Sequence, residues 1–193
     1  MVTAFDRCRA FERQYMAETM LPFLRTFAAD GVVRTDKGRL AAHLQVTVGD
    51  ALVNSRRTGD VVAIECKAEK QPRVNFFLEE WSNKPKLERV SSWDKPGWMH
   101  TCESDVLAYL IAPRQVVYTM RMPALRKWFR ANAERFRLAE QKRHVQRNRA
   151  WGRLVPIAHM STVPSVRMLQ WDVSCPTSPR LVPPPEFAGG GRW

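Results

Sequence analysis

Two acidic residues and one lysine have the side-chain types that metal-dependent hydrolysis of a phosphate ester requires. Asp50 lies in one segment rich in β-branched residues, and Glu65 and Lys67 lie in the next. Carboxylate oxygens bind hard divalent cations such as Mg²⁺, and bound Mg²⁺ polarises a phosphodiester and acidifies a coordinated water. A nearby ammonium group can steady that water or neutralise developing negative charge. The three residues therefore predict a phosphodiesterase site that uses Mg²⁺, with Mn²⁺ as a substitute.

A β-hairpin is the element expected to position these side chains. Residues 44–53 and 61–68 read as strands, and residues 54–60 between them have the composition of a turn. A hairpin centred between Arg57 and Thr58 places residues that are equally distant from this centre opposite each other. The Cβ atoms of such opposed residues lie about 4.5–5.5 Å apart. A bulge of one residue would change this pairing.

In that register Asp50 faces Glu65 across the hairpin. Strand side chains alternate between the two faces, so Lys67 shares the face of Glu65. Two carboxylates this close repel each other unless a cation lies between them. The alternative is a solvated ion pair of Glu65 with Lys67 on a surface hairpin, worth less than about 1 kcal/mol. Asp60 is a rival first acid, but its odd spacing from Glu65 directs it to the other face and predicts a turn residue.

The pattern resembles that of the PD-(D/E)xK nuclease superfamily. Asp50 matches the first acid of that family, and Glu65, Cys66 and Lys67 match its (D/E)xK segment at the end of an apolar strand. Gly49 stands where the family name has a proline, at a position that varies widely. The resemblance implies a restriction-endonuclease-like fold and a Mg²⁺-dependent endonuclease activity.

The same resemblance implies roles for individual residues. Asp50 and Glu65 would bind the metal, the backbone carbonyl of Cys66 would add a ligand, and Lys67 would be catalytic. The family also has an upstream helix that often carries a glutamate, for which Glu12 is the candidate. Ordinary placement at a helix edge explains Glu12 equally well. The resemblance further implies DNA as the expected substrate, with RNA left open, and is compatible with a homodimer.

Five other side chains are candidates for the cleft around this site. One continues the face of the catalytic lysine, two share a face of the strand predicted at residues 75–81, and a tryptophan could stack on a base. The fifth is an aspartate at the start of a predicted helix, where an acid is favoured without any role in catalysis. Surface or core placement is the structural alternative for the others. These candidates are Glu69, Glu79, Asn83, Trp98 and Asp105.

A strong excess of positive charge points to a polyanionic partner. The formal net charge is +12, and lysine or arginine set against phosphate releases condensed counterions. Much of the excess lies in one helix predicted from Pro123 to about Arg149, with Leu125, Phe129, Phe136 and Ala139 as its apolar stripe. A solvated helix face is the alternative to phosphate contact. The candidate nucleic-acid-binding residues are Arg126, Lys127, Arg130, Arg135 and Arg137.

The order of predicted elements indicates one α/β domain over residues 1–174, with a central mixed β-sheet flanked by helices. Residues 175–193 are rich in proline and glycine and predict an irregular tail. The remaining predicted elements are a helix at 4–29 with a break at Pro22 and a stop at Gly31, a strand from Val32, a short helix at 104–111, a strand at 115–122 and late strands at 151–159 and 166–173.

Several classes of protein are disfavoured by the sequence. It has no apolar run long enough for a membrane-spanning helix, so no membrane partner is expected. Its first residues do not resemble a secretory signal, which favours a cytoplasmic setting. The four cysteines form no CxxC pair, and the four histidines have no spacing typical of metal ligands.

Three functions remain open at this point. The first is a metal-dependent endonuclease that acts on nucleic acid, with DNA as the expected substrate. The second is a non-catalytic nucleic-acid-binding module that retains the nuclease fold. The third is a protein-interaction factor whose basic face binds an acidic protein.

Overall fold

Two β-sheets and several short helices form the described part of the protein. The computed structural model describes residues 10–11, 14–35, 49–83, 95–141 and 150–181. The larger sheet, sheet A, has seven strands, and all of its neighbouring pairs are antiparallel except the parallel pair β3–β6. The predicted α/β class with a mixed sheet is therefore confirmed. In spatial order, the strands are β1 (Ala28–Arg34), β2 (Ala51–Ser55), β3 (Val61–Glu69), β6 (Val106–Ile111), β7 (Val116–Arg121), β10 (Leu169–Asp172) and β11 (Cys175–Leu181).

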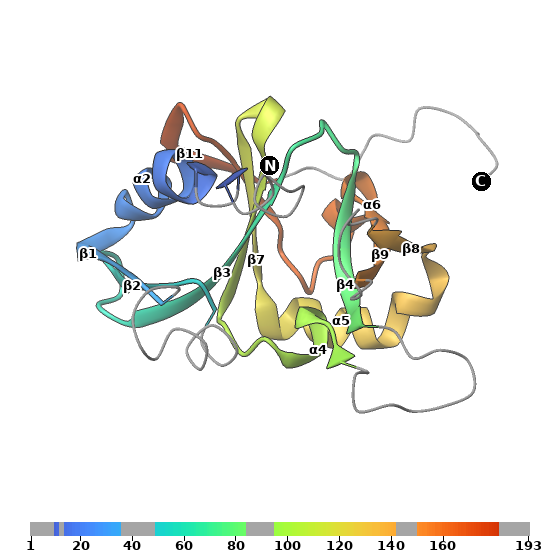
Figure 1. Cartoon of the computed structure of the whole chain (residues 1–193). Helices are drawn as coiled ribbons and strands as arrows, with labels where there is room; N and C mark the ends of the chain where they lie inside the picture. Colours follow the sequence, from blue (N-terminus) through green and yellow to red (C-terminus); the bar gives the residue numbers. More distant parts are fainter. Residues whose placement is uncertain (1–9, 12–13, 36–48, 84–94, 142–149, 182–193) are drawn as a thin grey trace.

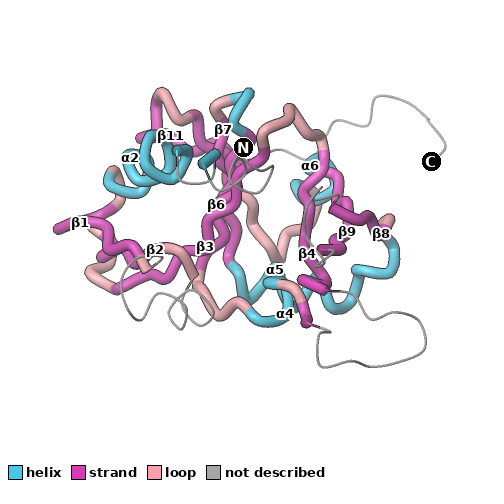
Figure 2. Tube along the Cα trace, in the orientation of Figure 1, coloured by secondary structure: helices cyan, strands magenta, loops and turns pink. Residues whose placement is uncertain are grey.

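A second sheet, sheet B, was not predicted. Figures 1 and 2 show it beside sheet A, with helices α4 (Trp98–Thr101) and α5 (Met122–Asn132) near one end of both sheets. In spatial order its strands are β5 (Lys95–Pro96), β4 (Asn75–Asn83), β9 (Ala150–Pro156) and β8 (Leu138–Gln141). The chain leaves sheet A after β3, builds β4 in sheet B, and returns through α4 to β6.

Two hydrophobic cores lie on the two faces of sheet A. The helix-side core packs that sheet against the N-terminal helical segment and includes Met20, Phe23 and Ile64. The inter-sheet core fills the space between the sheets and includes Phe76 of β4 and Leu107 of β6. Successive strand residues point to opposite faces, so both faces of the central strands are covered.

This alternation determines which residues of β3 reach the inter-sheet side. Ile64 and Cys66 pack in or against the helix-side core. Glu65 and Lys67 pair in parallel register with Leu107 and Tyr109, which belong to the inter-sheet core. The predicted sharing of one face by Glu65 and Lys67 is confirmed, and that face is turned toward sheet B rather than toward bulk solvent.

The predicted register of the β2–β3 hairpin is also confirmed. Ala51 pairs with Ile64, and Asn54 pairs with Val61. These are the partners required by a centre between residues 57 and 58. Asp60 is an exposed residue of the turn, where its backbone carbonyl accepts a hydrogen bond from the Ser55 amide.

The helix predicted at residues 104–111 is wrong, because Val106–Ile111 form strand β6. Five of its residues, from Leu107 to Ile111, are no more than 2% exposed. A short run of apolar residues does not distinguish a buried helix from a strand that is covered on both faces. Here β6 lies between β3 and β7 with a core on each side, so the run is continuous instead of alternating.

The basic helix predicted to reach Arg149 is also too long. Helix α5 ends at Asn132, a 3-10 turn covers Ala133–Arg135, and strand β8 follows. Residues 142–149 lie outside the described residues. Leu125 and Phe129 are buried in the inter-sheet core as the apolar stripe predicts, but Ala139 belongs to β8. Because Ala139 pairs with Gly152 of β9, strand pairing takes over where the helix was expected to continue.

Both ends of the predicted domain need correction as well. The N-terminal segment passes from a π-helix at Met16–Met20 to α2 (Leu21–Arg25). The helix therefore ends at Arg25, before the stop predicted at Gly31. Gly31 lies within β1, at an irregularity of the ladder where its φ of 152° suits glycine. Cys175–Leu181 form edge strand β11 rather than an irregular tail.

The late elements agree in part with the sequence. The strand predicted at 151–159 is β9, which gives way to helix α6 (Ile157–Ser161), and the strand predicted at 166–173 is the shorter β10. Over the described ranges, no helix has both the length and the apolar character needed to cross a bilayer.

Candidate active site

Asp50 is held at the start of β2 by the neighbouring strand. Its backbone amide donates to the carbonyl of Ile64 at 2.8 Å, and its Oδ2 accepts a hydrogen bond from the amide of Cys66 at 2.9 Å. The side chain of Asp50 is thereby tied to the backbone next to Glu65. The ladder of β2 with β3 begins at Ala51 and Ile64, so Asp50 lies just before the paired residues and reaches β3 through these two hydrogen bonds.

Gly49 makes this approach possible. It is buried and has a φ of 94°, a left-handed value that side chains rarely adopt. A Cβ atom at this position would lie 2.8 Å from the carbonyl oxygen of Ile64. Glycine is therefore the residue that this backbone requires at position 49.

Glu65 and Lys67 form an ion pair on the inter-sheet face of β3. The Glu65 side chain is 7% exposed and that of Lys67 is 33% exposed, so the acid is buried and the lysine side chain is partly exposed. Burial acts to lower the pKa of Lys67. The carboxylates of Glu65 and Asp50 outweigh that effect, with a smaller contribution from Glu79, and the pKa lies above its ordinary value. Lys67 is therefore positively charged at neutral pH.

Cys102, at the end of α4, closes the inner side of the site. Its thiol donates to Oε2 of Glu65 at 3.7 Å and lies 3.0 Å from the hydroxyl of Ser104. Burial and the negative charge of Glu65 both raise the pKa of this thiol. Both side chains are buried, so Cys102 is a neutral group that packs against the acid. Neither Cys102 nor Ser104 carries a sequence signal that would have identified it.

The outer side of the site is formed by sheet B and α4. The Nζ atom of Lys67 lies 5.4 Å from the centre of the Trp98 ring, and Glu79 of β4 is close enough to raise the pKa of Lys67. Oε1 of Glu79 accepts a hydrogen bond from the Ser82 hydroxyl at 2.5 Å. Two of the five cleft candidates, Glu79 and Trp98, therefore lie around the lysine.

The other candidates have different surroundings. Glu69 accepts a hydrogen bond from the Tyr109 hydroxyl at 3.0 Å, farther along the same face of β3. Asp105 directly precedes β6, and its carboxylate accepts a hydrogen bond from the amide of Ala63 at 2.8 Å. Its predicted place at the start of a helix is therefore wrong. Glu12 and the side chain of Asn83 lie outside the described part of the chain.

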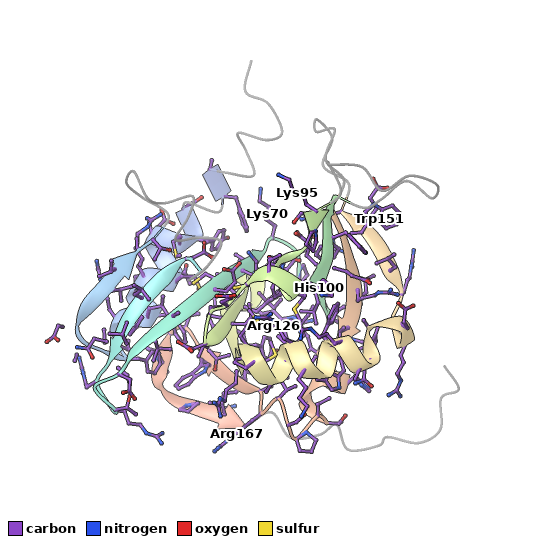
Figure 3. All side chains as sticks on the ribbon, turned by 90° about the horizontal axis from the view of Figure 1, so that it is seen from below. Lys70, Lys95, His100, Arg126, Trp151 and Arg167 are labelled. Carbon is purple, nitrogen blue, oxygen red and sulfur yellow. The ribbon has the colours of Figure 1, made fainter. Side chains whose placement is uncertain are left out.

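The basic residues of α5 differ in their environments. Arg126 donates to the backbone carbonyls of Cys102 at 2.6 Å and His100 at 3.1 Å, which joins α5 to the end of α4. Figure 3 shows Arg126 and His100 close together between these helices. Lys127 and Arg130 are exposed. Together with Arg126, they line an open groove of about 630 Å³ along α5.

The last two basic candidates lie beyond the helix. Arg135 and Arg137 are exposed, and the Arg135 guanidinium donates to Oδ1 of Asn132 at 3.0 Å. They do not line the groove that Lys127 and Arg130 share. The structure thus divides the predicted basic face into one anchoring arginine, two exposed cations on a groove, and two exposed cations outside it.

The described residues contain no group of three or more His, Cys, Asp or Glu side chains arranged to hold a metal ion. Comparison of the chain with family models, with curated proteins and with solved structures finds no match. Functional interpretation therefore rests on the two carboxylates, the lysine and their surroundings.

Proposed function

We propose that the chain is a metal-dependent endonuclease of the PD-(D/E)xK type, with a restriction-endonuclease-like fold, that hydrolyses phosphodiester bonds in nucleic acid. DNA is the expected substrate. The observation that carries the proposal is the convergence of Asp50, Glu65 and Lys67: an acid hydrogen-bonded to the backbone beside a second, buried acid, which is paired with a charged lysine.

The donor set suits Mg²⁺ in kind and number. Mg²⁺ is commonly held by one or two carboxylates, with water and substrate phosphate completing the octahedron. Asp50 and Glu65 would supply the carboxylates, and the carbonyl of Cys66 is the further ligand implied by the family pattern. A bound Mg²⁺ supplies Lewis acidity and a more acidic water. Two carboxylates therefore suffice, although no larger group of acids is present among the described residues.

The surroundings of Lys67 define what its side chain contributes. Because its pKa is raised, Lys67 cannot act as a neutral base near pH 7. It holds a fixed positive charge beside Glu65 and stabilises negative charge that develops on a phosphate. Cys102 and Ser104 exclude water from the inner side of Glu65, which strengthens the electrostatic interactions within the site.

The groove along α5 supports the nucleic-acid part of the proposal. Lys127 and Arg130 present positive charge to solvent on a groove whose third cation, Arg126, is bonded to the segment that ends in Cys102. Since the Cys102 thiol contacts Glu65, the groove is connected to the acidic site through a few direct contacts. A phosphate backbone lying along α5 would thus be positioned near the metal ligands.

Substitution of the three site residues tests the activity. Purified protein is incubated with plasmid, single-stranded and branched DNA in Mg²⁺ or Mn²⁺, and binding is followed by mobility shift in Ca²⁺. We expect Asp50→Asn, Glu65→Gln and Lys67→Ala each to abolish cleavage while binding persists. Asp60→Asn is the matched control and should cleave normally.

Two results would contradict the proposal. Loss of activity in Asp60→Asn with normal cleavage by Asp50→Asn would show that the first acid is assigned incorrectly. Binding of nucleic acid by the wild-type protein without cleavage under any metal or substrate would favour the non-catalytic binding module. Sedimentation of the complex establishes whether the homodimer implied by the family forms.

A further inference from the structure

The Lys67 ammonium lies between two groups of different chemistry. On one side is the carboxylate of Glu65, its ion-pair partner. On the other is the indole ring of Trp98, with its centre 5.4 Å from Nζ. A cation within about 6 Å of a ring centre and over its face is attracted by the negative potential of the π system. The lysine therefore has a second binding group that does not depend on Glu65.

Trp98 is itself held firmly against sheet B. The preceding residue, Gly97, donates its amide to the carbonyl of Glu80 at 2.8 Å. A Cβ atom at Gly97 would lie 2.4 Å from the carbonyl oxygen of Glu79, so only glycine permits α4 to start this close to β4. The Trp98 ring also packs against the inter-sheet core. Its position is set by the backbone and by packing rather than by Lys67.

We propose that Trp98 is a positioning residue for Lys67, with its ring keeping the ammonium in the site when Glu65 turns to a metal ion. This inference rests on the proposed function. If Glu65 held a dication, its carboxylate would attract the ammonium less, and the ammonium would also be repelled by the added positive charge. Without a second binding group the flexible lysine side chain would move into solvent, which a third of it already reaches.

The ring of Trp98 suits this role because it is uncharged. A carboxylate in the same place would compete with Glu65 for the metal or neutralise the lysine. An aromatic face attracts the ammonium without binding Mg²⁺ strongly, since Mg²⁺ prefers oxygen ligands. Glu79, which hydrogen-bonds Ser82, adds a longer-range attraction on the same side.

Proton NMR of lysine-labelled full-length protein tests the contact directly. Protons above the face of an aromatic ring are shifted upfield, so the ε-methylene signal of Lys67, assigned by its loss in Lys67→Arg, should lie upfield of the average lysine position. Lys70, whose Nζ atom lies 4.3 Å from the centre of the Phe11 ring, should give a second shifted signal that the Trp98 variants leave unchanged. We expect the Lys67 shift to persist on addition of MgCl₂ alone, to shrink in Trp98→Phe and to vanish in Trp98→Leu. Trp171→Leu is the matched control, because Trp171 packs on Phe23 and Phe27 on the helix side of sheet A.

Single-turnover cleavage at saturating substrate provides the second measurement. Trp98→Leu should lower the rate by about threefold to thirtyfold, the range expected for loss of an exposed to a desolvated cation–π contact. Trp98→Phe should recover part of that loss, and Trp171→Leu should cleave normally. Binding of DNA in Ca²⁺ should be the same in all three variants, because Trp98 acts through Lys67.

The outcomes separate this inference from the proposed function. An unshifted Lys67 signal in the wild type, or one that moves to the average position when MgCl₂ is added, overturns the positioning role. Weaker DNA binding by Trp98→Leu with an unchanged saturated rate overturns it as well, and assigns Trp98 to base stacking. If the signal behaves as expected and no nucleic acid is cleaved, the contact stands and the proposed nuclease activity fails.

Discussion

Replacement of Lys67 by methionine should destabilise the metal-free protein, and Mg²⁺ should restore most of the loss. Methionine retains the length of the side chain and can still contact the Trp98 ring, so the substitution removes mainly the charge. The Glu65 carboxylate, only 7% exposed, is then left without its cation. Glu65→Gln is expected to lower the free energy of unfolding by less, because the Lys67 side chain that remains is a third exposed.

The expected size of the destabilisation follows from the exposure of the two side chains of the ion pair. Removal of one partner from a fully buried pair costs about 3–5 kcal/mol, whereas an exposed pair contributes no more than about 1 kcal/mol. With one buried and one partly exposed partner, we expect Lys67→Met to lose about 2 kcal/mol, an intermediate value. For a chain of this size that corresponds to a fall in Tm of about 4–8 °C.

Urea unfolding with and without MgCl₂ measures the effect. Saturation of a site at 100 times its Kd adds about 2.7 kcal/mol to the free energy of unfolding, so Mg²⁺ should bring the variant close to the metal-free wild type. Equal stability of Lys67→Met and wild type without metal would refute the reasoning. So would a larger loss in Glu65→Gln than in Lys67→Met.

The pH dependence gives an independent check. The pKa of Lys67 is raised on folding, so its contribution to stability is complete below the unfolded value of 10.5 and declines as pH rises beyond it. The gap between wild type and Lys67→Met should therefore be constant near neutral pH and narrow in strong base.

Four other substitutions test the surroundings of the site. Arg126→Gln should lower the free energy of unfolding in urea by about 1.5–3 kcal/mol, because two hydrogen bonds to backbone carbonyls are lost. Lys127→Gln should leave that free energy unchanged. In a salt titration of nucleic-acid binding, it should reduce the slope of log K against log salt concentration by about 0.9. Gly97→Ala should lower the free energy of unfolding by about 1–3 kcal/mol and slow cleavage, because the new methyl group meets the backbone of Glu79. Cleavage at the wild-type rate would show that the position of α4 is unimportant for activity. Tyr109→Phe should lower the free energy of unfolding in urea by about 1–3 kcal/mol, since the buried Tyr109 hydroxyl joins Glu69 of β3 to an amide of β4. An unchanged free energy of unfolding would show that the contact is weak.

The hairpin could be predicted because its information is local. β-branched residues, a polar turn and the alternation of side chains are sufficient to predict the register of the hairpin, which the pairs from Ala51–Ile64 to Asn54–Val61 confirm. Asp50 lies next to these pairs and is bonded to Ile64 and Cys66 of β3. The lysine follows two residues later on the same face for the same reason. The chemistry at the centre of the candidate site was therefore accessible from the sequence.

The elements predicted incorrectly are those whose secondary structure depends on the strands and cores that pack against them. Residues 106–111 are apolar throughout because cores lie on both faces of β6, and such a run does not reveal its period. Residues 138–141 resemble the continuation of a helix but pair with β9. In both cases a partner distant in sequence determines the backbone conformation.

By itself, the sequence determined which groups could do chemistry and how they are ordered along one hairpin. Only the tertiary structure decided what surrounds them. It places β4 in a second sheet, brings Trp98 to the lysine and Cys102 to the acid, and uses Arg126 to anchor a helix. The physical reason is the range of the interactions. Strand alternation and turn preference act over a few residues, whereas the burial of Glu65 and the cation–π contact of Lys67 require the packing of two sheets against each other.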